Sequence, residues 1–166
     1  GEGRFPFHHI AADRDPLTEI VSKRWAERMG IQDILLPEVK YLVTGQSVFK
    51  GRTKRPDYIV SSGLCDYMKT REGSEPSKKG RFYNSMRKAL AVGGTYVNFN
   101  ILSDPRIMAE SNGLQPIFDW EPMYTVTIEQ MIRDHMHEGG FSPDEIQQVE
   151  VLDSGIAMVV AKKLRE

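Results

Sequence analysis

The sequence contains very little cysteine, almost no net charge and no long apolar run. Its single cysteine, Cys65, excludes an internal disulfide and fits a reducing compartment, so a cytoplasmic location is expected. A formal net charge of -1 gives no support for a broad electrostatic contact with nucleic acid. No apolar run approaches the roughly 20 residues that span a bilayer, and no charged leader precedes an apolar stretch at the N-terminus, so no membrane partner is expected.

The remaining composition is that of an ordinary globular domain. Of the 166 residues, 40% are apolar and 27% are charged, and both fractions are usual for such domains. A chain of this length is long enough to bury a core. Because no repeat, low-complexity tract or second domain is visible, residues 1–166 are expected to form a single α/β domain.

The first part of the chain is predicted to contain a strand, a helix and two further strands. Residues 7–12 form a short apolar-leaning run, and the next pattern is a helix that begins at Pro16 and ends at Gly30. The helix has an apolar stripe at helical spacing, formed by Leu17, Ile20, Val21 and Trp25. Residues 39–43 and 58–60 are predicted as the next two strands.

The middle of the chain is predicted as a loop, a helix and a strand. Residues 69–80 are rich in charges and helix breakers, and the lysines in this loop, Lys78 and Lys79, are expected to be solvated. The following helix has an apolar face made of Phe82, Met86, Ala89 and Leu90. The pair Gly93-Gly94 ends this helix before a strand at residues 95–101.

The last part is predicted as a long connection, a helix and a β-hairpin. Residues 102–124 are irregular and contain scattered apolar side chains, and connections of this length are more often functional than not. Thr127 and Gln130 have the spacing of a capping box at the start of a helix that ends at Gly139. Residues 149–161 contain two short strands joined by Asp-Ser-Gly, which is typical of a hairpin.

The order of these elements predicts an α/β fold with a mostly parallel sheet and a C-terminal antiparallel hairpin. In open parallel sheets, ligands bind at the carboxyl ends of the strands. The strand at residues 58–60 ends in small and polar residues, so its carboxyl end is the first candidate site. The residues at that end are Ser61, Ser62, Gly63, Cys65, Asp66 and Tyr67.

Two segments carry a resemblance to a known family. Residues 57–67, DYIVSSGLCDY, and residues 90–99, LAVGGTYVNF, resemble the fourth strand with its loop, and the glycine turn into the fifth strand, of class I S-adenosylmethionine (SAM)-dependent methyltransferases. That family has a three-layer, Rossmann-like sheet that ends in a similar hairpin. The later Asp119-Trp120 and Tyr124 are similar to a bacterial subgroup of the family. The resemblance covers the chain from Phe7 to the C-terminus.

The resemblance implies SAM as cofactor and assigns residues to its parts. Asp13 matches the acid that ends the second strand, whose carboxylate accepts hydrogen bonds from the ribose hydroxyls. Gln46 and Ser47 match the turn beside adenine. The residues expected under the methionine end are Ser61, Ser62 and Gly63. The residues expected to line the acceptor site are Leu64, Asp66, Tyr67, Trp120 and Tyr124.

One part of the family pattern is missing. The first strand and its Gly-x-Gly-x-Gly loop are expected before Phe7, but Gly1-Glu-Gly3 has no strand before it and no helix pattern after it. The missing strand would be the central one, between the second and the fourth. The chain therefore resembles the C-terminal portion of a methyltransferase domain that is incomplete at its N-terminus.

Several of these residues also have purely structural interpretations. Asp13 is a common residue type at a helix start. Asp66 and Tyr67 could cap and pack a crossover helix, or Tyr67 could act as a weak general base. Cys65 is expected to be a buried small residue and not a nucleophile. The apolar residues at 108–124 either line an acceptor pocket or cover the edge of the sheet.

The histidines do not form a metal-binding pattern. His8 and His9 would point to opposite faces of a strand, and His135 and His137 diverge on a helix. With a single cysteine as well, no metal site is expected.

Three functions remain open from the sequence. The first is SAM-dependent methyl transfer to a small-molecule acceptor, provided that the full-length protein supplies the missing motif. The alternative is a non-catalytic methyltransferase-like module for interaction or dimerisation, in which a partner chain pairs with the exposed strand edge of a homo-oligomer. A nucleotide-dependent reductase is disfavoured because no Gly-x-Gly-x-x-Gly follows a strand.

Overall fold

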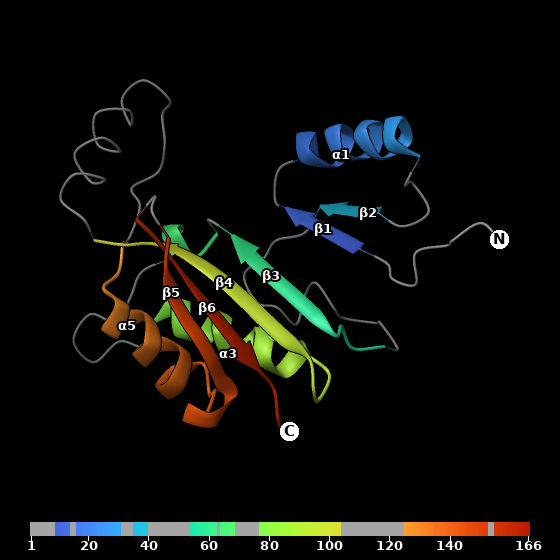
Figure 1. Cartoon of the computed structure of the whole chain (residues 1–166). Coiled ribbons are helices and arrows are strands. Elements are labelled where there is room, and N and C mark those ends of the chain that lie inside the picture. The colour runs from blue at the N-terminus through green and yellow to red at the C-terminus, as the bar shows by residue number, and fades with distance from the viewer. Residues whose placement is uncertain are drawn as a thin grey trace. The chain divides into compact units, whose positions relative to one another are not determined.

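The computed structural model describes residues 9–13, 16–30, 35–39, 54–62, 64–68, 77–103, 125–152 and 155–166. The chain forms two compact units, Gly1–Lys50 and Gly51–Glu166, and each is described by itself (Figure 1). The expectation of a single domain over residues 1–166 stays a prediction.

The first unit is a β-α-β arrangement. Strand β1 (His9–Asp13) pairs in parallel with β2 (Leu35–Val39), and helix α1 (Pro16–Met29) connects them. The predicted strand at residues 39–43 shares only Val39 with β2, and its other residues lie outside the described ones. Pro37 of β2 lacks the N–H that a ladder uses, and proline is tolerated in a strand where no ladder bond is required.

Helix α1 leaves its apolar stripe exposed. Among the side chains of the helix whose burial is described, Ala26 is buried, at 1% exposure, whereas Trp25 is 55% exposed. The other exposed apolar side chains of this helix are Leu17, Ile20, Val21 and Met29. The predicted stripe is therefore present, but the described residues do not cover it.

The second unit is a four-stranded sheet with the order β3-β4-β6-β5. Its strands are β3 (Tyr58–Ser62), β4 (Thr95–Ile101), β5 (Ile146–Val151) and β6 (Ile156–Lys162). Strand β3 is parallel to β4, whereas β6 is antiparallel to both β4 and β5. The predicted α/β fold, with parallel pairs followed by a closing antiparallel hairpin, is confirmed.

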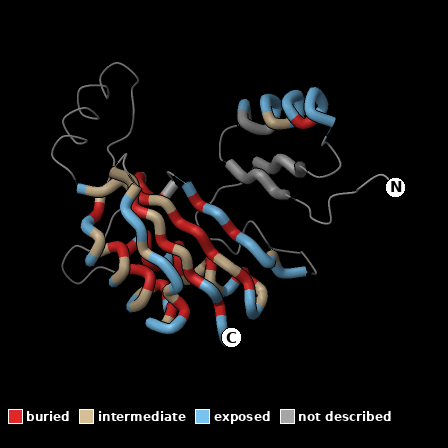
Figure 2. Tube along the Cα trace, in the orientation of Figure 1, coloured by how far each residue is buried: buried red, intermediate tan, exposed pale blue. Residues whose placement is uncertain are grey.

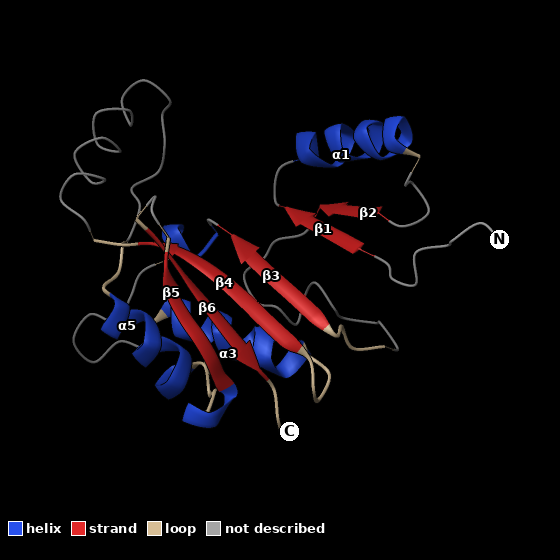
Figure 3. Cartoon of the chain, in the orientation of Figure 1, coloured by secondary structure: helices blue, strands red, loops and turns tan. Residues whose placement is uncertain are grey.

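Two helical segments cover one face of this sheet (Figure 3). They are α3 (Lys78–Ala89) and α5 (Ile128–Arg133), which continues as the π-helical segment η2 (Asp134–Glu138). The capping box of Thr127 and Gln130 is confirmed, with both of its hydrogen bonds present. The prediction of a loop over residues 69–80 is wrong at its end, because the Ser77 hydroxyl accepts a hydrogen bond from Gly80 N and starts α3 there.

The core lies between these helices and the sheet (Figure 2). Burial alternates along β3 and β6, as expected for strands with one covered face. Val126 and Met131 pack beside Ala157 and Val159, all at 0% exposure. Leu102, Ile146 and Val149 pack against this cluster, so the hairpin is held by apolar burial on its inner side.

A cluster of aromatic rings forms another part of this core. The rings of Tyr83 and His135 are stacked, with centroids 3.8 Å apart and planes at 16°. Tyr96 and Phe141 lie beside them, with centroids 6.1 Å apart. His135 Nδ1 is 2.7 Å from the carbonyl oxygen of Met131. Because burial lowers the pKa of His135 to about 4, the ring is neutral at pH 7.

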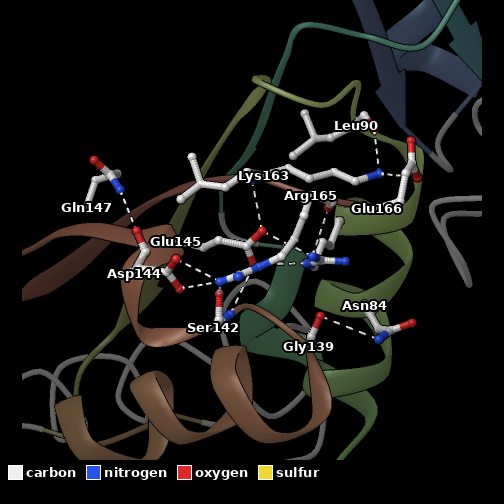
Figure 4. Close-up of polar contacts among 12 residues, drawn as sticks. Asn84, Leu90, Gly139, Ser142, Asp144, Glu145, Gln147, Lys163, Arg165 and Glu166 are labelled. Atoms are coloured by element: carbon white, nitrogen blue, oxygen red, sulfur yellow. Dashed lines mark hydrogen bonds and ion pairs between the residues drawn. The ribbon is translucent and has the colours of Figure 1, made fainter.

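A C-terminal ion-pair cluster (Arg87, Asp144, Glu145 and Arg165) holds the end of the chain (Figure 4). Glu145 has no exposed side-chain surface, and it accepts hydrogen bonds from Arg87 and from the backbone N–H of Leu164. Desolvation by burial raises the pKa of Glu145, but the hydrogen bonds from Arg87, Ser142 N and Leu164 N outweigh it and lower the pKa to about 2. The carboxylate therefore stabilises the fold at neutral pH.

Replacing Glu145 by glutamine is expected to destabilise the second unit by about 1–3 kcal/mol at pH 7, because a charged set of hydrogen bonds is lost. Since the folded pKa is below the unfolded one, the stabilisation is present above about pH 4.5 and is lost as the pH falls toward 2. Urea unfolding at several pH values measures this difference, with the exposed Glu150→Gln as the matched control. A deficit that persists at pH 2 would contradict the assignment.

His135→Phe is expected to remove a pH dependence from the unfolding free energy. The folded pKa lies below the unfolded one, so wild-type stability falls as the pH drops from 6.5 toward 4, by about 3 kcal/mol in total. Asp66 and Asp134, whose pKa values are raised by burial, have the opposite slope, but they are present in both proteins and cancel in the difference. The exposed His137→Phe is the control, and equal pH profiles for wild type and His135→Phe would refute the prediction.

Candidate functional site

The candidate site lies at the carboxyl ends of β3 and β4. Because the two strands are parallel, their carboxyl ends meet at one edge of the sheet. Strand β3 ends at the exposed Ser62, and the 3-10 helix η1 (Leu64–Tyr67) follows it. Gly63 lies outside the described residues. The hydrogen bond from Met68 N to Cys65 O, 3.1 Å long, closes η1.

Asp66 connects η1 to the end of β4. Its carboxylate is 2% exposed, and Oδ1 accepts hydrogen bonds from Ile101 N at 3.0 Å and from Asn100 Nδ2 at 3.2 Å. Burial raises the pKa of Asp66, while these two bonds and the positive charge of Lys79 act in the opposite direction. The sequence suggested that Asp66 caps a helix or lines the acceptor site. Its described hydrogen-bond partners are on β4, and its contact with an acceptor stays a prediction.

A network of buried polar side chains, the β4 polar network, runs along the helix-covered face of β4. Its members are Ser61, Tyr83, Tyr96, Asn98 and Asn100. Ser61 Oγ lies 2.7 Å from Tyr96 Oη and donates to Asn98 Oδ1 at 2.6 Å. Asn98 Nδ2 donates to Asn100 Oδ1 at 2.5 Å, and Tyr83 Oη donates to the same oxygen at 2.9 Å. The network therefore leads from β3 to Asp66.

Cys65 and Lys79 lie in the same buried region. Desolvation raises the pKa of the Cys65 thiol to about 12, so the thiol is protonated, and the prediction that this cysteine is buried is confirmed. The expectation that Lys79 is solvated is wrong, because the residue has 0% exposure at the start of α3. Burial lowers its pKa, whereas the charges of Asp66 and Asp134 act to raise it. Lys79 thus offsets part of the buried negative charge.

Sequence reasoning missed the β4 polar network, although a signal was present. Tyr96, Asn98 and Asn100 alternate along β4, so they share one face of the strand. Polar residues at this period on a strand between two others indicate a buried hydrogen-bond network. Lys79 had no comparable signal, because only the packing of α3 decides that it is buried.

The chain returns to the end of β4 after the segment 104–124. Ser103 Oγ and Thr125 Oγ1 are 2.9 Å apart although 22 positions separate them in the sequence. Leu102 and Val126 form a parallel bridge, and Ser103 N donates to Val126 O at 2.9 Å. Trp120 and Tyr124, which were predicted to line the acceptor site, lie outside the described residues.

The remaining predicted site residues divide between the two units. Asp13 is the last residue of β1, as predicted, and pairs with Val39, but its side chain is not described. Gln46 and Ser47 lie outside the described residues. The second unit brings Ser61, Ser62, Leu64, Asp66 and Tyr67 together at one strand end.

Two kinds of site find no support among the residues that the structure describes. No group of three or more His, Cys, Asp or Glu side chains there gathers as for a metal ion. No described helix has the length and apolarity to cross a bilayer.

Solved structures share this fold. An O-methyltransferase family 2 protein from Planctomyces limnophilus, solved as a complex with apigenin, matches with a TM-score of 0.67 at 14% identity, over 94% of this chain and 43% of its own. An O-methyltransferase family protein from Burkholderia thailandensis matches with a TM-score of 0.68 at 10% identity, over 94% and 43%. The structure of PigF with SAH matches with a TM-score of 0.66 at 11% identity, over 93% and 43%.

The chain spans less than half the length of these three proteins. No family model matches the sequence, and no curated protein matches it. Identities this low establish the fold alone. The resemblance to class I SAM-dependent methyltransferases is therefore confirmed at the level of the fold, and the chain has the fold of the C-terminal portion of such enzymes.

Proposed function

We propose that this chain is the C-terminal part of a SAM-dependent methyltransferase that acts on a small molecule. The observation that carries the proposal is the carboxyl end of β3 and β4, where η1 follows a parallel strand and is tied to its neighbour by Asp66. Parallel sheets bind ligands at this end. The shared fold includes a protein solved with SAH, the product form of the cofactor.

The residues at the strand ends suit the cofactor in chemical type. Asp13 ends β1, and its carboxylate offers two acceptor oxygens for a pair of ribose hydroxyls. The Ser61 hydroxyl is already hydrogen bonded to Asn98, so Ser61 would contribute its backbone, whereas Ser62 is exposed. Gln46 and Ser47 would lie beside adenine, and Gly63 would allow close approach of the methionine end.

Methyl transfer places few demands on protein side chains beyond positioning. When bound, SAM supplies an electrophilic methyl on a sulfonium sulfur, and an acceptor lone pair displaces it in line. The protein aligns the acceptor and excludes water. We assign the wall between acceptor and cofactor to Leu64, Asp66, Tyr67, Trp120 and Tyr124, and we assign no catalytic base.

The acceptor class is proposed as a small molecule of low charge. The net charge of -1 and the apolar side chains of residues 108–124 suit such a molecule better than a nucleic acid. The fold relative from Planctomyces limnophilus was solved with apigenin, a small organic ligand, which is consistent with this class.

A second candidate function is a non-catalytic module that pairs with another copy. Strand β3 is the terminal strand of the four-stranded sheet, and its outer face carries Tyr58 at 60% and Val60 at 50% exposure. Among the described residues, β3 is paired along one edge alone, and an unpaired strand edge favours strand pairing between chains. A homo-oligomer would follow from this candidate.

Calorimetric titration with S-adenosylhomocysteine tests the first proposal. Wild type is expected to bind, and Asp13→Ala is expected to weaken binding by about 1–3 kcal/mol, because a charged hydrogen-bond acceptor is lost. The exposed Asp57→Ala is the matched control and should bind like wild type. Unchanged affinity in folded Asp13→Ala refutes the ribose assignment. Absence of binding by the folded chain, together with a dimer in light scattering, favours the second candidate.

A further inference from the structure

Asp66 occupies the edge of β4 where β3 has already ended. The last pair between β3 and β4 is Ser62 with Phe99, whereas β4 continues to Ile101. Along its other edge, β4 is paired with β6 as far as Ile101. The amide of Ile101 therefore needs a partner on the β3 side, and Asp66 Oδ1 accepts from it at 3.0 Å.

The hydrogen bond between Asp66 and Ile101 does more than satisfy the last amide of a strand. A solvent molecule can satisfy an amide at a sheet edge, whereas a buried carboxylate carries a desolvation cost. Here the carboxylate is 2% exposed, and it belongs to η1, the helix at the candidate site. The hydrogen bonds of Asp66 therefore fix the position of η1 on β4.

The second partner of Asp66 is itself held in place. Asn100 donates to Asp66 through Nδ2, while its Oδ1 accepts from Asn98 Nδ2 and from Tyr83 Oη. The amide orientation of Asn100 is thus set by two donors, and its Nδ2 is directed to the carboxylate. Side chains locked by second hydrogen bonds hold their partners within narrow limits.

We propose that Asp66 is a positioning residue. It holds η1 on the end of β4, and so keeps Leu64 and Tyr67 of η1 in position to form the acceptor wall. The claim about the acceptor wall rests on the proposed methyltransferase function. The claim about η1 rests only on the hydrogen bonds of Asp66 with Ile101 and Asn100.

Substitutions at both ends of the contact test it in the whole chain. Asn100→Asp keeps the oxygen that accepts from Asn98 and Tyr83 but places a second carboxylate against Asp66. Asp66→Asn keeps the oxygen that accepts from Ile101 N and Asn100 Nδ2 and is the conservative variant. Asp66→Ala removes the contact altogether. Glu145→Gln weakens the C-terminal ion-pair cluster, at the other end of β4 from η1, and is the control.

Amide hydrogen exchange is the first readout, because it separates local opening from global unfolding. In Asp66→Ala and Asn100→Asp, the amides of Ile101 and Met68 are expected to exchange at least about tenfold faster relative to the amide of Val159 in β6, a factor that corresponds to about 1.4 kcal/mol. Asp66→Asn should keep most of the protection, and Glu145→Gln should leave the ratio unchanged. If Asp66→Ala does not fold, Asn100→Asp and Asp66→Asn decide.

Proportional changes at Ile101, Met68 and Val159 in every variant would overturn the proposal, because Asp66 would then only stabilise the fold globally. S-adenosylhomocysteine affinity is the second readout. We expect a loss of about tenfold or more in Asn100→Asp, little change in Asp66→Asn and no change in Glu145→Gln. If a variant shows faster exchange of the Met68 amide that closes η1 but binds S-adenosylhomocysteine with full affinity, the proposed link between the position of η1 and the binding site is wrong. No binding by wild type refutes the proposed function, and hydrogen exchange then decides the positioning of η1 alone.

Discussion

The pairing of β4 with neighbours on both edges is the constraint on which the second unit depends. Strand β3 runs parallel to it and β6 antiparallel, and the register places the polar residues Asn98 and Asn100 opposite apolar residues of β6. A central strand with polar side chains on a covered face is stable only when each of them is hydrogen bonded. The β4 polar network supplies those bonds from β3, α3 and η1, so the sheet, the helix and the candidate site are specified together.

The charges in this region follow from the same constraint. Asp66 is buried beside β4, and Lys79 and Asp134 are buried where α3 meets η2. A buried charge without an opposite charge nearby would lower the stability of the fold by several kcal/mol. The positive charge of Lys79 compensates the carboxylates of Asp66 and Asp134 in this way. The lowered pKa of Lys79 and the raised pKa of Asp66 both result from burial.

The two ends of β4 have different roles. At its amino end, Gly93 N and Gly94 O bond to the backbone of Lys163, and the C-terminal ion-pair cluster attaches the chain end to α3 (Figure 4). At its carboxyl end, the described partners of β4 include Asp66 and Val126, which belong to the candidate site and to the return of the chain after residue 124.

The sequence by itself determined the elements whose signals are local. Strand β4 at 95–101, the capping box at Thr127 and the closing hairpin were predicted correctly, because β-branched runs, side-chain caps and Gly-containing turns act over a few residues. Tertiary structure alone decided that Lys79 is buried, that α1 leaves its apolar stripe exposed and that Asp66 bonds to Ile101. Each depends on which distant segment packs against the residue, and no short-range pattern encodes that. The positions of Ser62, Leu64 and Tyr67 at one strand end were predictable, whereas the hydrogen bonds that hold them there were not.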